Sequence, residues 1–132
     1  LDEFTLQPMA GAHVELTGVT LMAAYHKDVG NDKDHIIVPD SAHGTNPASA
    51  ILAGYKVVTI PSDEKGMMDF NLFKEALNEK TAGVMLTCPN TLGVFNTRIK
   101  DICDAIEKST KYLLTENKSD IFNIKITRSI YI

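Results

Sequence analysis

The sequence predicts an α/β domain with a mostly parallel sheet and flanking helices. Short apolar runs that end in proline or polar residues alternate with segments of helical spacing along the chain. The chain has 132 residues, of which 44% are hydrophobic and 23% charged. This is enough for one globular domain and too little for two.

The first elements are a short strand-like stretch at residues 4–7 and a helix from Gly11 to about Lys27. The helix is expected because side chains recur on one face at Leu16, Val19, Thr20 and Ala23. A continuous apolar run then follows at residues 35–38, which is typical of a strand buried on both faces.

The middle of the chain repeats this alternation. Asn46 as N-cap and Pro47 as first helical residue predict a short helix that stops at Gly54. Residues 56–60 are a second strand of the buried type, and residues 83–87 are a third strand. Between them, Asp69 is the expected N-cap of a helix whose apolar stripe is Leu72, Phe73, Ala76 and Leu77.

A last amphipathic helix is expected to end at about Lys108. Its stripe is Ile99, Ile102, Cys103 and Ile106, so Cys103 is expected in the core. Residues 112–114 are interpreted as a further strand, and residues 121–132 have mixed β character.

An abrupt change of composition divides the chain. All the glycine, proline and alanine residues lie before position 106, and the last 24 residues contain none of them. We therefore expect a domain at residues 1–108 and a tail of different composition at residues 109–132.

The composition also excludes several classes of protein. No apolar run approaches the roughly 20 residues that span a bilayer, and a net charge of −4 argues against nucleic acid as partner. The first residues lack signal-peptide character, and the two cysteines have no pairing spacing. A cytoplasmic protein is expected, or a mitochondrial-matrix protein if a transit peptide preceded this sequence.

Three polar loops are expected to meet where ligands bind in parallel sheets, beyond the carboxyl ends of the strands: residues 7–13, 40–46 and 87–93. In the first loop, Gly11, Ala12 and His13 begin a helix, so free amides and the helix dipole favour an anion such as phosphate. The alternative is a turn that merely needs small residues.

The other two loops leave their chemistry open. His43 has the properties needed to stack on an aromatic ligand, bind a metal or cap a carbonyl, but no carboxylate or cysteine at ligand spacing accompanies it and His13. We therefore expect no metal site. Cys88 would need a base such as His43 to act as a nucleophile, and is otherwise a small thiol at a strand end.

Taken together and in order, these loops resemble the P-protein family of the glycine cleavage system, glycine dehydrogenase (decarboxylating), especially its carboxy-terminal half or second subunit. The motifs are LQP at residues 6–8, GAH and ELTG at residues 11–13 and 15–18, IVPDSAHGTNPASA at residues 37–50, and Thr87 with PNTLG at residues 89–93. The resemblance covers residues 4–108.

The resemblance implies part of the large domain of fold type I of pyridoxal-phosphate enzymes, which is the aminotransferase-like fold. It implies glycine as substrate, the lipoyl H-protein as acceptor of the aminomethyl group, and a second P-protein subunit or half as partner. By position, the implied cofactor-binding residues are Gly11, Ala12 and His13 at the phosphate, His43 stacked on the ring, Thr45 and Asn46 in the same pocket, and Asn90 and Thr91 near the phenolic oxygen.

The sequence departs from the family in ways that bear on activity. Val14 and Asn96 replace the usual glycine and glutamate. The segments with the ring-nitrogen aspartate and the Schiff-base lysine have no counterpart, so an inactive fragment is expected, with self-association through an exposed sheet edge. The alternatives are a non-catalytic module that binds phosphate ligands and another pyridoxal-phosphate enzyme of the same fold type.

Overall fold

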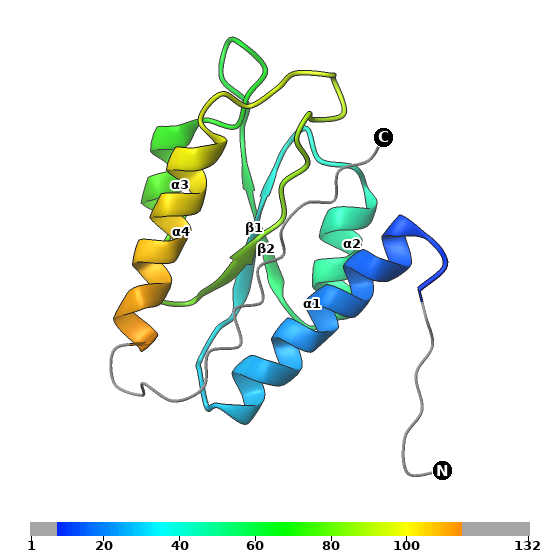
Figure 1. The fold of residues 1–132 in the computed structure, drawn as a ribbon, viewed down its shortest axis with the longest axis vertical. Helices are drawn as coiled ribbons and strands as arrows, with labels where there is room; N and C mark the ends of the chain where they lie inside the picture. The colour runs from blue at the N-terminus through cyan, green and yellow to red at the C-terminus, as the bar shows by residue number, and fades with distance from the viewer. Residues whose placement is uncertain (1–7, 115–132) are drawn as a thin grey trace.

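The computed structural model describes residues 8–114 (Figure 1). A sheet of strands β1, β2 and β3 is covered by helices α1 and α2 on one face and by α3 and α4 on the other. The elements, in order, are α1 (Gly11–Asp28), β1 (His35–Pro39), α2 (Thr45–Leu52), β2 (Lys56–Ile60), α3 (Phe70–Ala76), β3 (Thr81–Val84) and α4 (Ile99–Leu114). The expected α/β class with a parallel sheet and flanking helices is therefore confirmed.

The sheet is parallel and has the order β2-β1-β3, so β1 is central. All five residues of β1 are buried, which confirms the strand expected from the apolar run at residues 35–38. Parallel sheets bury both faces under their crossover helices, and this explains why the run does not alternate with polar residues.

Two hydrophobic cores meet on β1 because successive side chains of a strand point to opposite faces. Ile36 and Val38 pack with Val19 of α1 on one face. Ile37 packs with Phe73 of α3 and with Ile102 on the other. The strand is thus the element that both helical layers share.

The expected helix α1 is confirmed, and so is the cap of α3. The carboxylate of Asp69 accepts hydrogen bonds from the amides of Asn71 and Leu72 at 2.8 and 3.1 Å. Two stripe positions, Thr20 of α1 and Leu72 of α3, are exposed instead of buried, because each lies at the margin of its helix face.

The start of α2 differs from the expected one. The helix begins at Thr45 with Gly44 as N-cap, and no side chain caps it. Asn46 lies inside the first turn, where its amide donates to Glu15 of α1 at 2.6 Å. The predicted N-cap was wrong because the side chain of Asn46 is engaged by a residue distant in the sequence.

The third strand is also displaced. β3 spans Thr81–Val84 instead of residues 83–87, although the amide of Met85 still donates to the carbonyl of Ile37 at 3.0 Å. β2 occupies its expected position, but it is an edge strand, so Lys56 and Thr59 are exposed and the buried type was wrong for it.

Helix α4 corrects two expectations. It continues to Leu114, so residues 112–114 are helical and do not form a strand. Cys103 is exposed, and Ile102 is the stripe residue that α4 buries completely. The expected elements at residues 4–7 and 121–132 lie outside the described residues, and the division at residue 108 stays a prediction. None of the helices described is long and apolar enough to cross a membrane.

Candidate functional site at the carboxyl edge of the sheet

The strand order places a topological switch point between β1 and β3. The chain leaves β1 toward the α1–α2 face and leaves β3 toward the α3–α4 face, so the two connections diverge (Figure 1). Such a switch point is where open α/β sheets bind ligands. The second and third predicted loops are these two connections, and the hydroxyl of Thr91 donates to the carbonyl of Ser41 across the gap at 2.6 Å.

The first loop begins α1. The amides of His13 and Val14 both donate to the carbonyl of Ala10, so those of Gly11 and Ala12 precede the first bonds of the helix. No side chain among the described residues caps this end, and no acidic residue lies in its first turn. The N-terminus of α1 thus keeps the amides and the positive dipole end that favour an anion.

The second loop presents His43 on the surface. Its Nδ1 atom lies 3.0 Å from the hydroxyl of Thr45 and accepts a hydrogen bond from the Thr45 amide at 3.2 Å. Because the start of α2 holds one ring nitrogen, the orientation of the imidazole is restricted while the ring itself stays exposed. Cys88, by contrast, is half-buried, and Thr45 rather than this thiol engages His43.

The first two loops lie side by side because α1 packs against α2 (Figure 1). Their connection is the hydrogen bond from Asn46 Nδ2 to Glu15 Oε2. The other oxygens of the pair, Glu15 Oε1 and Asn46 Oδ1, are buried and have no hydrogen-bond partner in the described part of the chain.

The third loop is fixed by Asn90. Its Oδ1 atom accepts from the amides of Leu92 and Val94 at 3.0 and 2.9 Å, and its Nδ2 atom donates to the carbonyl of Gly66 at 2.8 Å. Both ends of the Asn90 amide are therefore engaged by other groups of the protein. Thr91, whose hydroxyl bonds to Ser41, is the residue that connects this loop to the second one.

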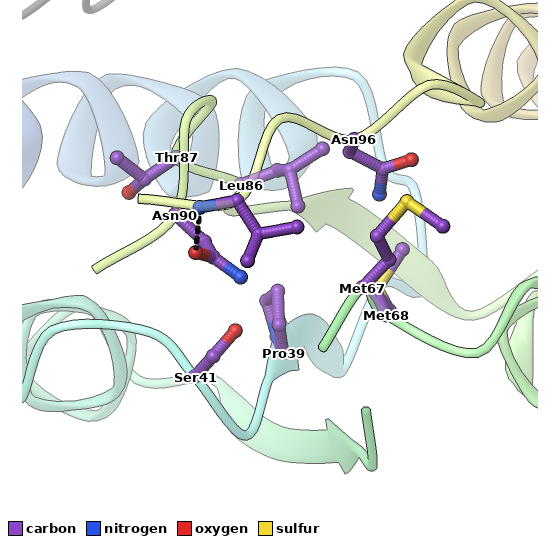
Figure 2. Close-up of a pocket in the computed structure, with 9 residues that line it drawn as sticks. Pro39, Ser41, Met67, Met68, Leu86, Thr87, Asn90 and Asn96 are labelled. Carbon is purple, nitrogen blue, oxygen red and sulfur yellow. Dashed lines mark hydrogen bonds between the residues drawn. The ribbon is translucent and has the colours of Figure 1, made fainter. Parts of the chain in front are cut away.

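A small cavity lies under these loops (Figure 2). Its volume of about 10 Å³ is close to the space of one water molecule. It is lined by Pro39, Ser41, Met67, Met68, Leu86, Thr87, Asn90, Val94 and Asn96. The cavity is too small for an aromatic cofactor, so a ligand of that size would lie on the open edge above it.

Asp40 ties β1 to the chain beyond β2 at the same edge. Its carboxylate accepts from the hydroxyl of Ser62 at 2.5 Å and from the amide of Ser62 at 2.9 Å. These two hydrogen bonds favour the charged form and hold the pKa of Asp40 below its usual range. A negative charge therefore lies three residues before His43, but its hydrogen bonds are to Ser62, beyond β2.

Several residues of this edge escaped prediction from the sequence. Ser62 and Met67 carry no motif signal, and Glu15 belongs to the ELTG motif but was not predicted as a site residue. The roles of all three depend on partners far along the chain. Asn96 is buried and lines the cavity. Its only sequence signal is that it replaces the glutamate usual in the family. Among the described residues, no group of three or more His, Cys, Asp or Glu side chains is arranged to hold a metal ion.

Solved structures share this fold. An aminotransferase from Eubacterium rectale superposes with a TM-score of 0.57 at 25% identity, over 73% of this chain and 25% of that one. A sphingosine-1-phosphate lyase from Burkholderia pseudomallei gives a TM-score of 0.56 at 24% identity, over 74% and 23%. The fold is therefore part of the large domain of fold type I of pyridoxal-phosphate enzymes, as expected.

Curated relatives are more similar in sequence. The probable glycine dehydrogenase (decarboxylating) subunit 2 of Pyrococcus horikoshii is 55% identical over 109 residues, which are 82% of this chain and 22% of that protein. Its namesake in Thermoplasma volcanium is 47% identical over 126 residues, or 94% and 27%. The chain thus spans about a quarter of the length of the curated relatives it matches.

The model of the class-V aminotransferase family matches residues 15–127. This range is most of the chain and includes the second and third loops with all three strands. Together with the likeness to the second subunits, the match confirms the resemblance found in the loop motifs. The chain belongs to the class-V aminotransferase family.

Proposed function

We propose that this chain forms the phosphate-binding and ring-binding part of the pyridoxal-phosphate site of a glycine dehydrogenase (decarboxylating) subunit 2. The observation that carries the proposal is the convergence of the three motif-bearing loops at the switch point, where Thr91 contacts Ser41 and Asn46 contacts Glu15. The names of relatives at 47–55% identity support the assignment of the reaction.

The chemistry of the donor set fits a phosphorylated aromatic group. The uncapped N-terminus of α1, at Gly11, Ala12 and His13, suits a phosphate. The exposed imidazole of His43, oriented by Thr45, suits stacking on a ring. When bound, pyridoxal phosphate would supply an electron sink for the loss of CO2 from glycine, while the residues of this chain bind and orient it.

The remaining predicted residues have different parts in this proposal. Asn46 belongs to the wall between the phosphate end and the ring end. Asn90 fixes the conformation of the third loop, because its side-chain amide is hydrogen-bonded to backbone groups of Gly66, Leu92 and Val94. Thr91 lies at the opposite side of the switch point from His43.

A binding measurement tests the cofactor site without interference from surface lysines. Pyridoxine 5′-phosphate lacks the aldehyde, so it reports non-covalent binding alone. We expect saturable binding by calorimetry, weaker binding of pyridoxine, and loss of binding in Gly11→Val, which crowds the start of α1. Equal binding of pyridoxine and its phosphate would contradict a phosphate site.

The chain alone is proposed not to turn over glycine. None of Lys108, Lys111, Lys118 and Lys125 has the sequence context of the family's Schiff-base lysine. We expect no stoichiometric, lysine-linked adduct after incubation with pyridoxal phosphate and borohydride, and no glycine-dependent exchange of labelled bicarbonate. Finding both would overturn this part of the proposal.

A chimera tests the reaction itself. The matching segment of the Pyrococcus horikoshii subunit is replaced by residues 4–108 of this chain, and the product is assayed for glycine–bicarbonate exchange. We expect exchange in the presence of the companion subunit and the lipoyl H-protein, and a large loss in the His43→Ala chimera. We propose these two proteins as partners and the cytoplasm as location.

A further inference from the structure

We propose that Glu15 and Asn46 are a positioning pair, which holds the phosphate end of the site against its ring end and is retained at a cost in stability. The inference rests on the function proposed above and gives a role to Glu15, which lies in the ELTG motif but is not among the predicted cofactor-binding residues. Glu15 lies in the second turn of α1, and Asn46 lies in the first turn of α2.

The contact joins the two helix starts directly. Asn46 Nδ2 donates to Glu15 Oε2 at 2.6 Å, a short charge-assisted hydrogen bond. Gly11 begins the helix that carries Glu15, and Thr45, which holds His43, precedes Asn46. Any change in the Glu15–Asn46 distance therefore changes the distance between the proposed phosphate and ring sites.

The charge of Glu15 also suits this place. α2 has no side-chain cap and no acidic residue in its first turn. The carboxylate from α1 supplies the negative charge that a helix N-terminus favours. The side chain of Asn46 is only 7% exposed, so this interaction takes place largely out of water.

The pair is nevertheless incomplete. Glu15 Oε1 and Asn46 Oδ1 are buried and have no hydrogen-bond partner among residues 8–114. A buried acceptor without a partner costs free energy, and apolar side chains of similar volume often serve stability better than a buried polar pair. Two helices that only needed to pack would gain from an apolar contact here, so we infer that the pair serves the geometry of the site.

The test separates stability from affinity. The double variant Glu15→Met/Asn46→Leu replaces the pair by apolar side chains, and we expect a higher urea midpoint together with weaker binding of pyridoxine 5′-phosphate. The loss of one charge-assisted hydrogen bond predicts weakening by about tenfold or more. If the pair were merely structural, the double variant would change the urea midpoint and the affinity for pyridoxine 5′-phosphate in the same direction, and that result would contradict the proposal.

Single variants assign the effect to Glu15 itself. Glu15→Gln keeps an oxygen that accepts from Asn46 but loses the charge, so a smaller loss of affinity is expected than in Glu15→Met, which loses the acceptor while Asn46 is intact. Glu75→Met, on the exposed face of α3, is the matched control for the lost charge. Wild-type affinity in Glu15→Met contradicts this inference alone, but a wild-type chain that binds no pyridoxine 5′-phosphate contradicts the proposed function as well.

Discussion

Single side chains at the carboxyl edge carry most of the connections between loops. Thr91, Asn90 and Asp40 each bond to a residue at least 20 positions away along the chain. The positions of the polar loops could be predicted from short stretches of sequence, because glycine, proline and small polar residues act on the local backbone conformation. Their partners, Ser41, Gly66 and Ser62, follow from the strand order, which no local pattern contains.

The contact between Asp40 and Ser62 predicts the acid stability of the chain. A carboxyl group whose pKa is lowered on folding stabilises the folded state above its unfolded value of about 4, and this contribution is lost as the pH falls through the lowered folded value. Ser62→Ala removes the hydroxyl donor, so we expect acid unfolding at a higher pH, measured by circular dichroism. In Asp40→Asn, the further substitution Ser62→Ala should leave the acid midpoint unchanged.

Burial at single positions predicts a second effect. Phe73 is fully buried between α3 and the sheet, whereas Leu72 is 39% exposed on the same helix. Phe73→Ala should lower the free energy of unfolding by about 3–5 kcal/mol. Leu72→Ala should lower it by about 1 kcal/mol or less. Urea denaturation measures both changes. Similar losses in the free energy of unfolding for the two variants would contradict the difference in burial between Phe73 and Leu72.

At the level of helices and strands, the sequence predicted which elements are present better than it predicted where each one begins and ends. Helix α1 is long and strand β1 is uniformly apolar, and both were located correctly. The Asp69 cap was also located correctly, because its signal is local. The bounds of β3 were displaced because its register on β1 shifts after His35, a tertiary feature. Cys103 was assigned to the core because its spacing from Ile99 places it on the apolar stripe, but the stripe that α4 buries is narrower and leaves Cys103 exposed.

Helix α1 contains a glycine with no structural need. A methyl group added at Gly18 would meet no atom of the described residues within 4 Å apart from its chain neighbours and the nearby helix backbone, and Gly18 lies in the interior of the helix. Gly18→Ala should therefore stabilise the chain by about 0.5–1 kcal/mol. Gly54, which has equally free space but a φ of +91°, is the matched control, and Gly54→Ala should destabilise. Stabilisation by both substitutions in thermal melts would contradict the conformational argument.

On the scale of the whole molecule, the described sheet has two outer strands, β2 and β3, each with one neighbour. Unpaired strand edges promote association. We expect the mass of the 132-residue chain in analytical ultracentrifugation to rise with concentration. Thr59→Lys, which adds a charge at an exposed position of β2, should reduce this association. A concentration-independent monomer would contradict the expectation.

The fold class and the location of the candidate site followed from the sequence, since both depend on the alternation of strands and helices and on loops that follow strands. The distances between the loops did not, because they depend on how α1 packs on α2 and on which strands are neighbours. This explains why Asn46 was assigned to the correct loop but to the wrong local role.

The central place of β1 also has a consequence for the order of folding. Both neighbours of β1 are synthesised after it, first residues 56–60 and then residues 81–84. During synthesis, β1 and β2 with the intervening α2 are complete while the other side of β1 still awaits β3. A nascent chain at this stage exposes Ile37 before α3 and α4 cover it, so this is the interval in which a chaperone would find an unprotected apolar strand.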